Sequence, residues 1–212
     1  MSPVGRPRAF DMEKVLEAAA LLFWEHGYEA TSMAQLREAT GLSSASVYGT
    51  FGSKYGLFER AVEHYMAGPG SVTAVVDDES LSPRDAVALM LHRSIDMQTD
   101  PSHPRGCLVS LAGVVGDKAK DPHKDEETDR AAAHSTMKEW RAVGRARIRA
   151  CVVRGVAAGE LPADTDVDVI ASMIHSFQLG LSTQVCDGMP AQSLHAAADA
   201  VLAVWRVPVH GG

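Results

Sequence analysis

One stretch of the chain, TSMAQLREATGLSSASVYGTFGSKYGLF at residues 31–58, limits the possible folds most, because it contains three helix starts in close succession. Ser32 precedes the first helix and has a glutamine three residues later, which is the spacing of a capping box. Ser43 and Ser53 stand at two further N-cap positions. Gly41 lies between the first two helices and tolerates the left-handed backbone of a tight turn. The stretch therefore predicts two short helices, a glycine turn and a third helix.

The second of these helices has two different sides. Val47 and Phe51, four residues apart, form its inward side. The other side carries small or hydrogen-bonding groups without formal charge, namely Ser44, Ala45, Ser46, Tyr48, Gly49 and Thr50. A helix, a turn and a second helix with a small polar side form a helix-turn-helix unit, which lays its second helix in a DNA major groove. The alternative is an ordinary helical hairpin with solvated serines.

These residues also resemble the tetracycline-repressor (TetR) family of bacterial transcription regulators. The resemblance is specific over about residues 6–66 and only architectural beyond them. It rests on Gly27-Tyr28, Thr31-Ser32-Met33, Leu36, Gly41-Leu42-Ser43, Val47-Tyr48, Phe51, Lys54 and Leu57. It implies an all-α homodimer with an N-terminal DNA-binding part and a C-terminal part that binds a small hydrophobic inducer. Gly49 and Thr50 depart from the family, which often has aromatic or histidine side chains there, so base contacts cannot be transferred.

We divide the chain accordingly. Residues 1–10 form a basic N-terminal arm, residues 11–67 the helix-turn-helix domain, called the head below, and residues 68–212 a ligand-binding and dimerisation domain, called the body. Arg6 and Arg8 of the arm can reach phosphates or a minor groove, although a disordered tail with solvated arginines is an equal alternative.

The formal net charge of −7 argues against nonspecific nucleic-acid binding. Arm and head together, residues 1–67, have six Lys and Arg against eight Asp and Glu, a difference of −2. Affinity for DNA must therefore come from dimerisation and a few placed cations, with Arg37 among them. Tyr48, Thr50 and Lys54 are expected at phosphates, and Ser44 and Ser46 at base edges. The full set of DNA-binding candidates is Arg6, Arg8, Ser32, Ser44, Ala45, Ser46, Tyr48, Gly49, Thr50 and Lys54.

Apolar residues at helical spacing predict that the body is built from helices. The expected helices are 83–98, a short one from Cys107 to about Val115, a long one at 126–158, then 166–187 and 191–206, with residues 68–82 and 117–125 as loops. We expect a mainly apolar pocket for the inducer between helices 83–98, 126–158 and 166–187. Its candidate lining residues are Met90, Met97, Cys107, Met137, Trp140, Met173 and Phe177, and the alternative is that they are plain core.

The last two helices carry much apolar surface, which predicts a four-helix dimer interface with a symmetry mate. One side of helix 166–187 is rich in small residues and allows another helix to approach closely. The interface candidates are Val169, Ser172, Ser176, Gly180, Leu194, Ala198, Val201 and Trp205. The alternative is that these faces are buried inside one subunit.

Cys107 follows Arg105 and opens a short helix, and both features favour a reactive thiolate. Some TetR-like sensors of electrophiles or oxidants resemble this chain at Gly106-Cys107-Leu108. A small buried hydrophobe is the alternative reading of Cys107. Redox or electrophile sensing is therefore a secondary hypothesis.

Other classes of protein receive little support from the sequence. The three cysteines have no zinc or disulfide spacing, and the nine histidines are scattered outside any catalytic motif, so we expect no metal, no cofactor and no enzyme. No signal peptide or membrane-spanning run is present, so we expect a cytoplasmic protein. An inducer-free DNA-binding module is the main alternative to a ligand-controlled repressor, and a hydrolase or metal enzyme is a distant one.

Overall fold

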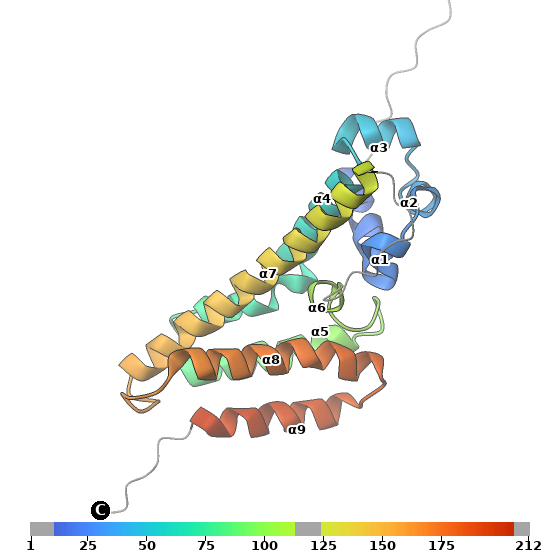
Figure 1. The fold of residues 1–212 in the computed structure, drawn as a ribbon. Coiled ribbons are helices and arrows are strands. Elements are labelled where there is room, and N and C mark those ends of the chain that lie inside the picture. The colour runs from blue at the N-terminus through green and yellow to red at the C-terminus, as the bar shows by residue number, and fades with distance from the viewer. Residues whose placement is uncertain (1–10, 113–123, 206–212) are drawn as a thin grey trace, which may run out of the picture.

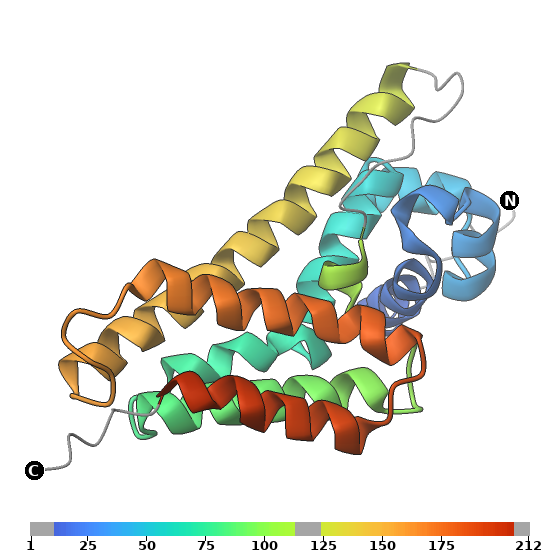
Figure 2. The same cartoon turned by 60° about the horizontal axis from the view of Figure 1, so that its bottom comes forward.

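The computed structural model describes residues 11–112 and 124–205, and all regular elements in these two ranges are helical, as the sequence predicts. Figures 1 and 2 show an elongated molecule with the head at one end and long helix α7 running from the head along the body. The elements are α1 (Met12–Ala30), α2 (Met33–Thr40), α3 (Ser44–Phe51), α4 (Lys54–Ala67), η1 (Pro69–Asp77), α5 (Pro83–Thr99), α6 (Leu108–Leu111), α7 (Lys124–Ala157), α8 (Val167–Cys186), α9 (Ala191–Val201) and η2 (Leu202–Trp205).

Capping side chains set the helix starts in the head. The Ser32 side chain accepts from the Gln35 N–H while the Gln35 side chain pairs with the Ser32 backbone, so the predicted capping box is present. Ser43 and Ser53 cap α3 and α4 in the predicted way. Gly41 ends α2 with φ 69° and ψ 8°, a left-handed conformation that favours glycine.

The core of the head joins all four of its helices. Phe23 of α1 and Phe58 of α4 meet edge to face, 5.0 Å apart at the ring centroids. Leu36 of α2 and Val47 of α3 are fully buried against them. Residues of α6 and α7 continue the same cluster, with Leu108, Val109, Ala133 and Met137 buried in it. The head is therefore packed directly on the body rather than tethered to it.

The body has a second core between α5, α7, α8 and α9. Ile95 of α5, Ile148 of α7, Ile174 of α8 and Leu194 of α9 are all fully buried in it. The Ser82 side chain accepts from the Asp85 N–H and caps α5. The expected loop at 68–82 is wrong in part, because Pro69–Asp77 forms a 3₁₀ helix whose Thr73 and Val76 are buried against the body.

One other expectation needs correction. Helix α6 begins after Cys107, its N-cap, and ends at Leu111, so it is shorter than expected; the rest of that expected helix lies outside the described residues. Asp11 precedes α1 but makes no side-chain cap, and its carboxylate pairs with Lys14 instead. In the two described ranges, no helix is both long and apolar enough to cross a membrane.

Candidate DNA interface and head–body cavity

Helix α3 presents the outward side that the sequence predicted. Ala45, Gly49 and Thr50 are exposed, and Tyr48 is the most exposed large hydrophobic residue of the head at 53%. Ser44 and Ser46 are half-buried on the same helix. A Cβ added to Gly49 would meet no atom within 4 Å, so the surface is open at that point. Val47 is fully buried beneath it and fixes which side of α3 faces outward.

Two of the candidate serines already serve the fold. The Ser32 hydroxyl lies 2.7 Å from Gln35 Oε1 within the capping box. The Ser46 hydroxyl lies 2.9 Å from that of Ser43, the N-cap of α3. Both hydroxyls keep further hydrogen-bonding capacity, since a hydroxyl has one donor and two acceptor sites. Their local bonds hold them in fixed orientations at the helix starts.

Lys54 begins α4 beside the end of α3. Its Nζ lies 4.3 Å from the centroid of the Tyr28 ring, a cation–π contact. Tyr28 itself packs against Phe58 and Phe23. The ammonium group is thereby held next to the positive end of α4, where it adds to the helix dipole. Arg37, another predicted cation, is exposed on α2. Arg6 and Arg8 lie outside the described residues.

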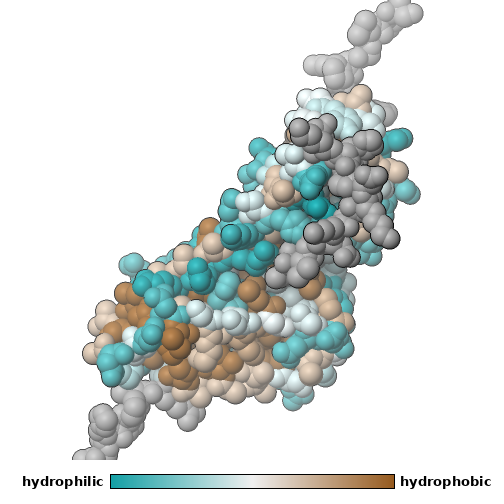
Figure 3. Space-filling model, viewed as in Figure 1, coloured by the Kyte–Doolittle hydropathy of each residue, from teal (hydrophilic) through white to brown (hydrophobic). Residues whose placement is uncertain are grey.

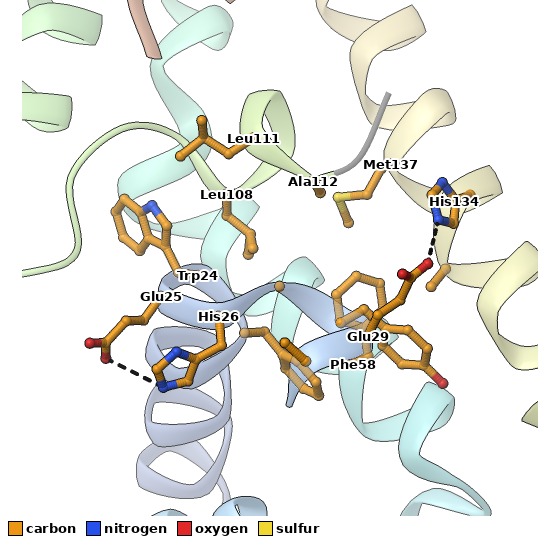
Figure 4. A pocket seen from close by; sticks show the side chains of 15 residues that line it. Trp24, Glu25, His26, Glu29, Phe58, Leu108, Leu111, Ala112, His134 and Met137 are labelled. Atoms are coloured by element: carbon orange, nitrogen blue, oxygen red, sulfur yellow. Dashed lines mark hydrogen bonds and ion pairs between the residues drawn. The ribbon is translucent and has the colours of Figure 1, made fainter. Parts of the chain in front are cut away.

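A cavity of about 380 Å³ lies where the head meets the body, between α1, α4, α6 and α7. Figure 4 shows Trp24 on one side and the Glu29–His134 pair on the other, with Leu111 and Ala112 above. Phe23, Tyr28 and Phe58 contribute aromatic rings to its lining. The described residues that line it are Phe23, Trp24, Glu25, His26, Gly27, Tyr28, Glu29, Ala30, Phe58, Leu108, Leu111, Ala112, Ala133, His134 and Met137.

Gly27 forms part of the wall of this cavity. Its φ of 78° and ψ of 168° interrupt α1, and such backbone angles favour glycine. The interruption turns residues 28–30 so that Glu29 reaches α7, where its carboxylate lies 3.1 Å from His134 Nε2 and 3.9 Å from Arg130 Nε. A Cβ on Gly27 would meet no atom within 4 Å, in keeping with the open space beside it.

Comparison with known proteins identifies the architecture. Residues 15–61 match the family described as "Bacterial regulatory proteins, tetR family", and residues 83–201 match "Tetracyclin repressor-like, C-terminal domain". The second match alone spans more than half of the chain. The chain belongs to the TetR family. It is accordingly a helix-turn-helix transcriptional regulator and not an enzyme.

Individual TetR-family relatives agree with this. The HTH-type transcriptional repressor ComR of Escherichia coli (strain K12) is 29% identical over 207 residues, covering 95% of this chain and 91% of ComR. The repressor BdcR of the same organism is 42% identical over 110 residues, covering 52% of this chain and 55% of BdcR. A solved structure of the TetR regulator CifR, a cysteine mutant complexed with 26-bp operator DNA, is 36% identical with a TM-score of 0.82; the match covers 94% of this chain and 100% of CifR.

The residues predicted to line a pocket in the TetR-type body do not come together around one cavity. Met137 lines the head–body cavity. Met90 is fully buried in the body core, and Phe177 packs against that core. Met173 is 40% exposed on the outside of α8, so the expectation that it lines a pocket between helices is wrong. Met97, Cys107 and Trp140 are half-buried beside the cluster that joins head and body, outside the cavity lining.

The predicted dimer surface divides into two groups. Val169, at 59% exposure, Ser172 and Ser176 face outward on α8, and Gly180 is half-buried. Figure 3 shows brown surface gathered over the end of the body where α8 begins and α9 ends. Leu194, Ala198 and Trp205 are buried inside the protomer because α9 packs on α5 and α8 and η2 packs on α5, and Val201 is half-buried. For these buried residues, the alternative of burial within one subunit is the correct one.

Cys107 lies at the junction of head and body. The Tyr65 hydroxyl of α4 donates to its Sγ over 3.3 Å. Burial raises the pKa of the Tyr65 phenol well above its ordinary value, with Cys107 as the next cause, so the phenol keeps its proton at neutral pH. Arg141 of α7 holds the segment that follows Cys107, because its guanidinium donates to the Val109 and Ala112 carbonyls at 2.8 and 3.2 Å.

Sequence reasoning missed the head–body cavity and a surface pair in the body. The rings of His92 on α5 and His195 on α9 stack with Nδ1 atoms 2.6 Å apart, and their Nε2 atoms lie 3.0 Å from Asp199 and Asp96 respectively. The aromatic run FWEHGY at the end of α1 was the available signal for the cavity. The histidine pair gave no signal, because its members are 103 residues apart.

Proposed function

We propose that this regulator is a repressor that binds a palindromic operator as a two-fold symmetric dimer. The observation that carries the proposal is the outward side of α3, which is small, polar and open above the buried Val47. The operator complex of the similar CifR structure supports the same use of the head. A dimer that sets two α3 helices one helical turn apart would read two half-sites in successive major grooves.

Within each half-site we assign distinct roles to the residues of the head. Ser44 and Ser46 contact base edges, because hydroxyls both donate and accept. Tyr48, Thr50 and Lys54 contact phosphates, since Tyr48 and Thr50 lie on the exposed side of α3 and Lys54 begins α4. Gly49 and Ala45 allow close approach of the helix. Ser32 contacts a phosphate at the start of α2, and Arg6 and Arg8 extend the contacts along the DNA.

The dimer interface in this proposal is the outer side of α8, with Val169, Ser172, Met173 and Ser176. These side chains are exposed and are followed along α8 by Gly180. Small residues at this spacing let a second helix approach closely, and the apolar end at Val169 and Met173 supplies area for burial. We include in the interface the exposed Ala196 and Ala200 of α9 and Ala203 of η2.

The test is selection from random double-stranded DNA with purified protein. We expect enrichment of an inverted repeat with half-site centres about 10 base pairs apart, or a multiple of that spacing. Alanine at Ser44 or Ser46 should change the preferred base within each half-site. Recovery of unrelated sequences, or a monomer at micromolar concentration, would overturn the proposal.

We also propose that a small hydrophobic ligand controls this repressor. A ligand that binds the free protein more tightly than the operator-bound protein must release DNA, by linkage. The open space between head and body supports such control, because helices of both domains line it.

A second candidate mode of control is electrophile or oxidant sensing at Cys107. The observation that favours it is the polar contact of Cys107 Sγ with the Tyr65 hydroxyl, 3.3 Å away at the junction of head and body. A quinone or hypochlorite should then release the operator from wild type but not from Cys107→Ser. Equal release from both proteins, or release from neither, makes Cys107 structural.

A further inference from the structure

We infer that the head–body cavity is the regulatory ligand site and that it takes a planar aromatic molecule without an acidic group. This inference rests on the proposed repressor function and names the site and the ligand chemistry. The site lies outside the region between α5, α7 and α8 where the sequence led us to expect it. Its volume of about 380 Å³ falls within the usual range for small-molecule sites, roughly 300–1,000 Å³.

The lining sets the shape of the ligand. Phe23, Phe58 and Tyr28 form one connected aromatic group, with ring centroids 4.9 to 6.1 Å apart. Trp24 stands on the other side of the cavity (Figure 4). Aromatic rings pack best against a flat partner in stacked or edge-to-face contact. Met137 adds a thioether that adapts to the outline of such a ligand.

The polar groups of the lining set the charge of the ligand. Glu25 pairs with His26 at 4.0 Å, and Glu29 pairs with His134 at 3.1 Å, so each carboxylate has a neighbouring imidazole. Arg130 lies 3.9 Å from Glu29 but is not among the residues that line the space. Among the described residues, the lining thus contains two carboxylates and no Lys or Arg. An acidic ligand would meet repulsion there without a permanent positive partner.

Two contacts between head and body flank the cavity. A bound ligand would lie against side chains of both contacts, because Trp24, Glu29 and His134 line the cavity. On one side, Trp24 Nε1 donates to the Gly106 carbonyl over 3.2 Å and its ring stacks on His103 at 4.3 Å. On the other side, Glu29 meets His134 of α7. Trp24 and Glu29 both belong to α1, a helix of the head.

This arrangement couples the ligand to DNA. The width of the cavity depends on how α1 sits relative to α6 and α7, because those helices form its opposite walls. A ligand that fits one head–body arrangement stabilises that arrangement in both subunits of a dimer. The distance between the two α3 helices then departs from the spacing of the operator half-sites, and DNA affinity falls.

The experiment uses the full-length protein, 1-naphthol as the probe and 1-naphthoate as its acidic counterpart. Calorimetry measures probe binding to the free protein, and fluorescence anisotropy measures operator affinity with and without probe. Leu111→Trp narrows the mouth of the cavity from a residue that is 40% exposed. Val153→Trp is the matched control, because Val153 is 43% exposed on α7 and is not part of the lining.

We expect wild type and Val153→Trp to bind 1-naphthol and to lose operator affinity with it. Leu111→Trp should bind 1-naphthol at least about tenfold more weakly, a difference of about 1.4 kcal/mol, and should keep its operator affinity in the presence of probe. 1-Naphthoate should bind wild type more weakly than 1-naphthol. Ala133→Leu, which fills the cavity from α7, replaces Leu111→Trp if that variant is unfolded by circular dichroism.

Three outcomes would overturn the inference. They are no binding of 1-naphthol to wild type at millimolar concentration, equal binding to wild type and the cavity variants, and binding that leaves operator affinity unchanged. Failure of the repressor proposal gives a different result. The protein then selects no operator, while calorimetry still measures whether 1-naphthol binds in the cavity. Probe binding that is lost in Leu111→Trp under those conditions supports the ligand site and removes only the link to DNA.

Discussion

Trp24 of the head donates its indole N–H to the backbone carbonyl of Gly106 in the body, 3.2 Å away. The two residues are 82 positions apart, and both are buried. The same indole meets the Tyr65 ring edge to face, with centroids 4.8 Å apart. One side chain therefore ties α1, α4 and the segment before α6 together.

Trp24→Phe should weaken this junction. The substitution keeps an aromatic ring but leaves the Gly106 carbonyl without its donor, which costs about 1–3 kcal/mol for a buried group. We expect a lower denaturation midpoint and an altered operator affinity. Trp205→Phe is the matched control, since its indole also donates one hydrogen bond, to Glu160 at 3.0 Å, but η2 lies at the far end of the body. An equal effect of both variants on operator affinity would argue against a special role of Trp24.

Lys54→Ala should weaken binding to every DNA sequence and reduce the slope of log affinity against log salt by about one unit. The reason is the loss of one cation at a phosphate, at the positive end of α4. Titrations at several salt concentrations measure the slope. Arg60→Ala removes a cation from the same helix, where it pairs with Glu63 at 3.4 Å, and should leave the slope unchanged. An unchanged slope in Lys54→Ala removes Lys54 from the set of phosphate contacts.

Ser32→Ala should destabilise the head by about 1 kcal/mol, because it removes the side-chain half of the capping box at α2. Ser82→Ala is a useful comparison, since Ser82 caps α5 without a reciprocal side chain. Chemical unfolding measures both variants. No loss of stability in Ser32→Ala would show that the contacts of the Ser32 hydroxyl with Gln35 contribute little to the stability of the head.

Local signals explain which parts of the fold were predictable. Ser32, Ser43 and Ser53 each accept from a backbone N–H three residues later, so short sequence patterns located the starts of three helices. Gly41 marked the turn because its left-handed backbone conformation is also a local property of one residue. The net charge, in contrast, carried no sign of DNA binding, because the interface depends on the placement of a few groups and not on their number.

Contacts between distant segments explain what was missed. The periodicity of α9 identified an apolar side containing Leu194 and Ala198 but not its partner, and the structure packs that side on α5 within one protomer. The cavity depends on the meeting of Glu29 and His134, 105 residues apart, after the interruption at Gly27. Methionine content suggested a pocket elsewhere, although Met90 simply fills the core.

Ser176→Arg should convert the proposed dimer to monomer. Ser176 is exposed in the middle of the outer side of α8, and a long charged side chain there would keep two helices apart and leave charges facing each other across the two-fold axis. Sedimentation measures the state of association, and operator affinity should fall with it. Ser71→Arg adds the same charge at an exposed position on η1 and should stay dimeric. A dimeric Ser176→Arg would move the interface away from this part of α8.

The stability of the protein should fall as the pH drops below about 6.5, and His175 should account for part of that fall. Burial on α8 lowers the pKa of His175 below its ordinary value, and the positive charges of Arg145 and Arg141 on α7 lower it further. The unfolded chain therefore binds a proton at this histidine more readily than the folded protein does. Where the unfolded state binds more protons, stability decreases as the pH falls.

His175→Gln should remove this contribution while keeping a polar side chain of similar size. We expect a shallower decline of the unfolding free energy between neutral pH and about pH 5 than in wild type, measured by urea unfolding at each pH. Above pH 7 the neutral imidazole is present in both states, so its titration makes no contribution to the difference there. Parallel pH profiles for the two proteins would show that the imidazole titrates alike in the folded and unfolded states. That result would contradict the effect expected from its burial on α8 near Arg145 and Arg141.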